Sequence, residues 1–163
     1  MLDDVLKTLD GRQHQALAKL KEFLAIPSVS AKPDHAGDVR RCANWLADQL
    51  RFAAMDTSVM ETRNPSGKPG HPVVVARNKH VPGRPTVLLY GHYDVQPPEP
   101  LELWTSPPFE PTVRKDEHGF DAVFARGAVD DKGQVWAHVE AITAFAQMEM
   151  LEAGYGAVAE FHY

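Results

Sequence analysis

Three segments of the chain are predicted to be helical, two of them because apolar side chains recur at helical spacing. In residues 3–25, leucines three and four positions apart predict an amphipathic helix, with Asp10–Gly11 as a point where it could break. A second helix is predicted from Asp34 to about Ala54, and a third from Asp131 to about Gln147. The second helix carries a stripe of apolar positions: Val39, Cys42, Ala43, Leu46 and Leu50. This stripe is expected to face the core.

Short apolar runs between the second and third helices predict strands. Residues 57–62 alternate weakly between apolar and polar, and residues 72–76 are rich in valine. Residues 86–90 form a continuous apolar run between Pro85 and Gly91, which is typical of a strand buried on both faces in a parallel sheet. This order of helices and strands predicts an α/β layered domain.

A proline-rich loop and a hairpin are predicted before the third helix. Residues 96–111 are dense in proline, which blocks regular strand pairing, so they are expected to form a structured loop. Residues 113–116 and 120–125 flank the turn Glu117-His118-Gly119 and predict a pair of strands.

Composition and charge narrow the class of protein. The 163 residues suit one domain, and 44% hydrophobic with 24% charged residues is ordinary for a globular chain. The formal net charge of −5 argues against a nucleic-acid partner, which usually needs a basic face. A single cysteine, Cys42, has no partner for an internal disulfide and is expected to be a small buried side chain. No apolar run is long enough to span a membrane and no secretory signal opens the chain, so a cytoplasmic location is expected.

The first candidate for chemistry is His92 with Asp94, directly after the predicted buried strand. Ligand sites in open α/β sheets lie beyond the carboxyl ends of strands. Residues i and i+2 of extended chain point to the same side, so Asp94 can hold the imidazole of His92 in one orientation. The alternative is a surface histidine with a local hydrogen bond.

The second candidate is the pair Asp130–Asp131, which also follows a short strand and opens a helix. Adjacent carboxylates repel one another, so a nearby cation would stabilise them. The alternative is N-capping of the helix, and one aspartate could do each job. Lys132 is expected as a surface charge or as a partner of Asp131. A histidine and a carboxylate that converge beyond two strands would suit catalytic zinc.

Three segments resemble a known family. Residues 87–97 (VLLYGHYDVQP) and 126–133 (RGAVDDKG) resemble the two signatures of the co-catalytic zinc peptidases, and residues 104–111 (WTSPPFEP) resemble the segment between them. This family includes carnosinase-like dipeptidases, aminoacylases, succinyl-diaminopimelate desuccinylases and carboxypeptidases. The first and middle segments look most like the dipeptidase branch. The resemblance implies an incomplete three-layer α/β/α catalytic domain with a mostly parallel or mixed sheet.

The resemblance also implies roles for particular residues. His92 would ligate one zinc, Asp130 would bridge two zincs, and Asp94 would orient His92 as an active-site residue. Asp131 would support a ligand by hydrogen bonding or cap the helix, and the Asp130–Asp131 peptide is expected to be cis. Trp104 is a candidate for lining the substrate cleft, with packing against the sheet as the alternative. Two zinc ions are the expected cofactors, with cobalt or manganese as possible substitutes.

The implied reaction is hydrolysis of a dipeptide or a related amide, such as an N-acyl amino acid, by a metal-activated water. Residues 1–147 are expected to be the N-terminal part of the catalytic domain, and residues 148–163 to be a divergent tail. The tail shows no match to the consecutive glutamates that supply the family's general base and a further zinc ligand. The family's lid domain, through which members often dimerise, is also not recognised. The alternatives are therefore a catalytically silent fragment, or a non-enzymatic scaffold or interaction domain on the same fold.

Overall fold

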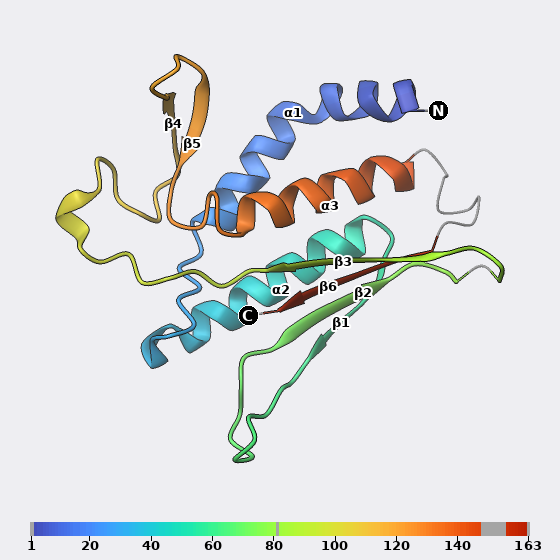
Figure 1. Cartoon of the computed structure of the whole chain (residues 1–163), viewed down its shortest axis with the longest axis horizontal. Helices are drawn as coiled ribbons and strands as arrows, with labels where there is room; N and C mark the ends of the chain where they lie inside the picture. The colour runs from blue at the N-terminus through green and yellow to red at the C-terminus, as the bar shows by residue number, and fades with distance from the viewer. Residues whose placement is uncertain (1, 81, 148–155, 163) are drawn as a thin grey trace.

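The computed structural model describes residues 2–80, 82–147 and 156–162, with backbone alone for residues 147 and 156–162. Helices and strands follow one another along the chain as shown in Figure 1. The elements are α1 (Leu2–Leu24), η1 (Pro33–His35), α2 (Ala36–Phe52), β1 (Asp56–Met60), β2 (Val73–Arg77), β3 (Thr86–His92), η2 (Leu101–Leu103), β4 (Thr112–Lys115), β5 (Asp121–Phe124), α3 (Lys132–Gln147) and β6 (Gly156–His162).

The main sheet is mixed, with the order β1-β2-β6-β3 among the described strands. The strand β2 pairs antiparallel with both β1 and β6, whereas β6 pairs parallel with β3. The last strand of the chain thus lies between two earlier strands (Figure 1). The strands β4 and β5 form a separate antiparallel pair, which confirms the predicted hairpin. The predicted α/β class with a mixed sheet is confirmed.

The described helices α2 and α3 cover the same face of the sheet. The helix α2 contacts β1 and β2, α3 contacts β3, and the two helices contact each other. Their apolar residues join Val74 and Ala76 of β2 in one buried cluster, with Leu89 of β3 packed against it. The helix α1 packs on α3. No described helix is long and apolar enough to cross a membrane.

The helical predictions agree with the structure in their main features. All five residues of the predicted stripe in α2 are buried, so the period of apolar positions identified the core face correctly. Burial raises the pKa of the Cys42 thiol, as expected for an unreactive core cysteine. The helix α1 runs without interruption through Asp10–Gly11, where a break was considered.

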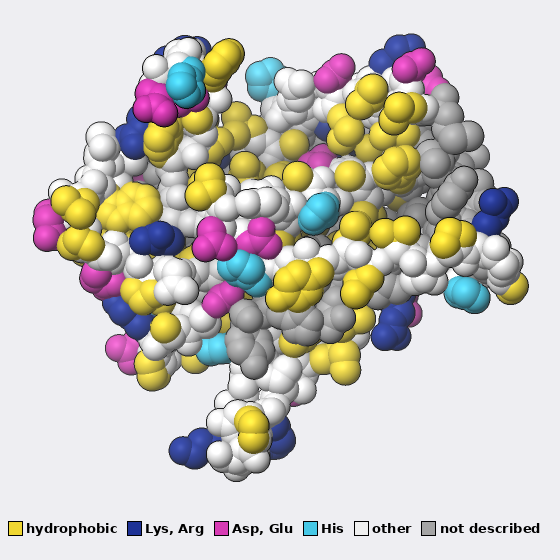
Figure 2. Space-filling model, in the orientation of Figure 1, with side chains coloured by type: hydrophobic (Ala, Val, Ile, Leu, Met, Phe, Trp, Pro, Cys, Tyr) yellow, Lys and Arg dark blue, Asp and Glu magenta, His cyan; other side chains and the backbone are white. Residues whose placement is uncertain are grey.

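The prediction that residues 86–90 are buried on both faces is wrong. Leu88 is 58% exposed and Tyr90 is 60% exposed, whereas Leu89 packs against the core. The reason is the position of β3 at the edge of the described sheet, with α3 on one face only. Figure 2 shows exposed apolar side chains beside a histidine and acidic side chains on the face in view.

Candidate metal centre

The carboxyl end of β3 places His92 at the edge of the sheet, and the chain then continues through Asp94. The connector between α1 and α2 holds this segment from one side. The Ser28 hydroxyl donates a hydrogen bond to the Tyr93 carbonyl at 2.7 Å, and the Val95 N–H donates to the Ser28 carbonyl at 2.9 Å. These bonds fix the backbone on both sides of Asp94.

The structure brings His92, Asp94 and Asp130 together. His92 Nε2 lies 2.9 Å from Asp130 Oδ1, and His92 Nδ1 lies 3.0 Å from Asp94 Oδ1. The His92 side chain is 32% exposed, that of Asp94 19% and that of Asp130 71%. Figure 2 shows acidic side chains beside a histidine on this face of the molecule. The two sequence clusters therefore meet at a point that solvent can reach.

The two carboxylates have different relations to the imidazole of His92. Nδ1 faces both the carboxylate of Asp94 and its main-chain carbonyl, the latter at 3.2 Å, so it is placed to donate. With a metal in place of the proton between Nε2 and Asp130, the Nε2 lone pair would face that metal, as a ligand requires. Burial alone would lower the pKa of His92, but attraction to Asp94 and the hydrogen bond with Asp130 outweigh it and raise the pKa. The pair Nε2 and Oδ1 fits a divalent metal, which would take the place of the shared proton.

Asp131 joins the start of α3 to the end of β3. Its Oδ2 accepts a hydrogen bond from the His92 N–H at 3.1 Å. The Asp130–Asp131 peptide bond is cis, as the sequence resemblance implied. Asp131 thus supports the backbone of a candidate ligand from the neighbouring turn.

The turn before α3 and the first turn of that helix each have one position that is packed too tightly for a side chain. Gly127 has φ +84°, and a Cβ there would lie 2.6 Å from Val95 Cγ1. A Cβ on Gly133 would lie 2.1 Å from the carbonyl oxygen of Ala128. These close approaches hold Asp130 beside the segment that carries His92.

Trp104 lies in the proline-rich loop and makes contacts within it. Its indole N–H donates to the Pro98 carbonyl at 2.7 Å, and the Arg126 guanidinium lies 5.0 Å from its ring centroid. Arg126 also donates to the Pro97 carbonyl at 3.1 Å. Trp104 therefore helps to hold the loop, and its part in a substrate cleft stays a prediction.

Two residues near the site have contacts that the sequence patterns did not predict. The Ser30 hydroxyl donates to Asp94 Oδ2, although a serine in an extended connector gives no signal of this role. Lys132 is fully buried, and its ammonium donates to the carbonyls of Phe23 at 2.9 Å and Ile26 at 2.7 Å. The expectation of Lys132 as a surface charge or partner of Asp131 is wrong, because the end of α1 covers the start of α3.

Comparisons with known proteins identify the family that this chain resembles. The model of "Peptidase family M20/M25/M40" matches residues 88–155, which include residues 88–97 of the first signature and all of the second. The matched region belongs to peptidase family M20/M25/M40. The Cys-Gly metallodipeptidase DUG1 of Candida albicans is 31% identical over 147 residues, which are 85% of this chain and 30% of that protein. The human Beta-Ala-His dipeptidase is 31% identical over 156 residues, which are 91% of this chain and 30% of that protein.

A solved structure of an M20/M25/M40 relative has the same fold over nearly the whole chain. The dipeptidase Dug1p of Saccharomyces cerevisiae superposes with a TM-score of 0.83 at 27% identity, covering 99% of this chain and 34% of that one. The chain therefore spans about a third of the length of the relatives it matches.

The described part of this M20/M25/M40 segment supplies only a partial ligand set. Among the described residues, no group of three or more His, Cys, Asp or Glu side chains is placed to hold a metal ion. Asp94 and Asp130 lie on opposite nitrogens of His92, so only Nε2 and Asp130 converge on one point. The backbone of β6 brings His162 into register with His92 on the neighbouring parallel strand.

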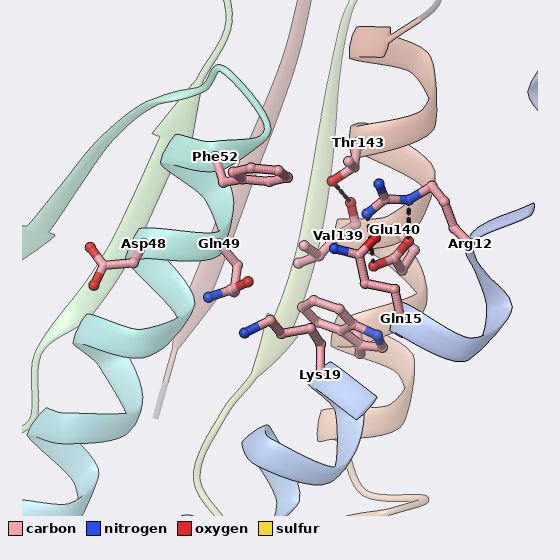
Figure 3. Close-up of a pocket in the computed structure, with 10 residues that line it drawn as sticks. Arg12, Gln15, Lys19, Asp48, Gln49, Phe52, Val139, Glu140 and Thr143 are labelled. Atoms are coloured by element: carbon pink, nitrogen blue, oxygen red, sulfur yellow. Dashed lines mark hydrogen bonds and ion pairs between the residues drawn. The ribbon is translucent and has the colours of Figure 1, made fainter. Parts of the chain in front are cut away.

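A separate pocket of about 330 Å³ lies among α1, α2 and α3, away from the candidate metal centre (Figure 3). The Arg12–Glu140 ion pair closes one side of it, at 3.1 Å between Nε and Oε2. Phe52 and Gln49 of α2 lie across from Val139 of α3 in the same view. None of His92, Asp94 and Asp130 lines this pocket, so it has no part in the proposed metal chemistry.

Proposed function

We propose that the chain is the N-terminal part of a metal-dependent hydrolase of dipeptides. The observation that carries the proposal is the 2.9 Å approach of His92 Nε2 to Asp130 Oδ1 at the carboxyl end of β3. The imidazole and carboxylate are a typical ligand pair for catalytic zinc. The printed names of the relatives, which are dipeptidases, support the substrate class.

The proposed roles follow from the contacts of each side chain. His92 and Asp130 hold metal, and Asp94 holds His92 so that Nε2 keeps its lone pair for the metal. Zinc, or cobalt or manganese in its place, would be held by His92 and Asp130, and would supply a Lewis acid for the scissile carbonyl and for a water molecule. A second zinc shared through Asp130 belongs to the proposal. Asp130 suits that bridging role because its side chain is 71% exposed and carries two oxygens.

Several finer points stay predictions. An N-acyl amino acid is the alternative substrate class, since aminoacylases share these signatures. Dimerisation through a lid domain would need residues outside the three segments that resemble the family, which are residues 87–97, 104–111 and 126–133. The cytoplasmic location rests on composition alone. Residues 148–155, where the predicted divergent tail begins, lie outside the described residues.

The decisive experiment measures dipeptide hydrolysis by the purified chain. Metal is first removed with a chelator, and zinc, cobalt or manganese is then added back with Cys-Gly and β-Ala-His as substrates. We expect amino-acid release only with metal, and its loss in His92→Ala. The matched control is His118→Ala, because His118 lies in the β4–β5 turn with a side chain 70% exposed. Turnover without metal, or turnover that His92→Ala leaves intact, would contradict the proposal. No turnover at all would favour the silent fragment.

A further inference from the structure

The connector between α1 and α2 runs beside the segment that carries His92 and Asp94, and it contacts that segment through two serines. Ser28 bonds main-chain atoms of the segment. Ser30 instead bonds a side chain, since its hydroxyl donates to Asp94 Oδ2. The Ser30 carbonyl in turn lies 3.0 Å from His71 Nε2, which ties the connector to the chain entering β2. The connector is thus anchored on both sides.

The carboxylate of Asp94 is held at both of its oxygens. Oδ1 lies 3.0 Å from His92 Nδ1, while Oδ2 accepts the hydroxyl of Ser30. A carboxylate bonded at one oxygen can rotate about its last torsion, where the energy wells are broad. A second bond at the other oxygen removes that freedom. Because the Asp94 side chain is only 19% exposed, few water molecules can replace a lost partner.

We propose that Ser30 is a positioning residue of the metal centre, acting through Asp94 on His92. The hydroxyl fixes the plane of the Asp94 carboxylate, and this plane keeps the acceptor oxygen opposite His92 Nδ1. The imidazole then keeps its proton on Nδ1 and its lone pair on Nε2, on the side of Asp130. This inference rests on the metal site of the proposed function, but it does not require that the chain hydrolyse peptides.

Loss of the Ser30 hydroxyl should therefore weaken metal binding without removing a ligand. Groups that support a ligating histidine from behind typically change metal affinity by about 10- to 100-fold when removed. Ser30 is one hydrogen bond further from the metal than Asp94, because it contacts Asp94 and not His92. We expect Ser30→Ala to raise the dissociation constant for cobalt about tenfold, at the lower end of that range.

The test titrates the metal-free chain with Co²⁺ and follows visible absorption, which reports the ligand field directly. Ser30→Thr keeps a hydroxyl and should bind cobalt with the affinity of the original chain. Ser28→Ala is the matched comparison. It removes a buried hydroxyl from the same connector, but that hydroxyl donates to a main-chain carbonyl and not to the Asp94 side chain. We expect Ser28→Ala to lower the melting temperature more than Ser30→Ala, and to change the cobalt affinity less.

A second measurement needs no metal. The ¹⁵N chemical shifts of the His92 ring, recorded at a pH where it is neutral, should show a larger Nδ1–H fraction in the original chain than in Ser30→Ala, although Nε2–H can donate to Asp130 when no metal is bound. Ser30→Ala should move part of the population to the Nε2–H form. Unchanged tautomer populations, or equal cobalt affinities for Ser30→Ala and the original chain, would overturn the inference. Cobalt bound with this dependence on Ser30, but without dipeptide turnover, would instead refute only the proposed hydrolysis.

Discussion

Replacing Lys132 with methionine is expected to lower the free energy of unfolding by about 3 kcal/mol. The ammonium donates to the carbonyls of Phe23 and Ile26, at 2.9 and 2.7 Å, and the side chain is 0% exposed. Phe23 lies in the last turn of α1, where the helix dipole favours a cation, and Ile26 lies two residues beyond the helix. Methionine has a similar length but no donor, so both carbonyls would lose their hydrogen bond to the ammonium and keep only those from the N–H groups of Ile26 and Ser28.

Burial also lowers the pKa of Lys132, which reflects how far its ammonium lies from water. The charge is stabilised there by the carbonyls of Phe23 and Ile26 and by the Phe23 ring, whose centroid lies 4.9 Å from Nζ. Replacement by a neutral residue avoids the cost of burying a charge but removes the charged donor from both carbonyls. We expect the second effect to be larger, since the main chain cannot move away without opening the α1–α3 contact.

Urea unfolding followed by circular dichroism measures the effect. The control is Lys19→Met, because Lys19 lies in the same helix α1 with its side chain 35% exposed and pairs with Glu22 at 2.8 Å. Exposed pairs of this kind contribute about 0.5 kcal/mol or less. If Lys132→Met proved as mild as Lys19→Met, the buried ammonium would not stabilise the end of α1.

Local patterns in the sequence predicted most of the elements, because the period of apolar positions depends only on neighbouring residues. The stripe of α2 follows from such a period, and the β4–β5 hairpin follows from the turn residues between its two strands. The burial of β3 could not be predicted in this way. An apolar run indicates that a strand can be buried. Whether the strand is in fact buried depends on which other elements cover it.

In the candidate site, too, some contacts could be predicted from the sequence and others could not. His92 and Asp94 are two residues apart, so extended geometry alone predicted their contact. Asp130 was linked to them by the position of its strand and by the resemblance to the family. Ser30 and Asp94 are 64 positions apart, and Lys132 and Phe23 are 109 apart. No periodic pattern connects residues at such distances, so only the folded structure reveals these contacts.

The contacts around the site depend on the turn that precedes α3. Asp130 and Asp131 both lie in this turn, and Asp131 binds the His92 N–H. Its shape is set by main chain packed against main chain, since Gly133 leaves no room between itself and Ala128. A change that widens the turn should therefore affect stability and metal binding together.

Replacing Gly133 with alanine is expected to lower the free energy of unfolding by about 3 kcal/mol and to weaken metal binding. The new Cβ would lie 2.1 Å from the Ala128 carbonyl oxygen and 3.3 Å from its carbonyl carbon. Backbone atoms cannot give way as a flexible side chain does, so the turn that carries Asp130 must shift. Thermal melting and a cobalt titration measure the two effects.

The matched control is Gly11→Ala, which places the same side chain in α1, where a Cβ would meet nothing within 4 Å. Alanine favours a helix interior over glycine by about 1 kcal/mol, so this variant should be more stable than the original chain. The same substitution thus has opposite expected signs at two helical glycines, and only one of them supports the metal centre. A Gly133→Ala chain with the original stability and cobalt affinity would show that the turn adapts, and that Asp130 does not depend on this packing for its position.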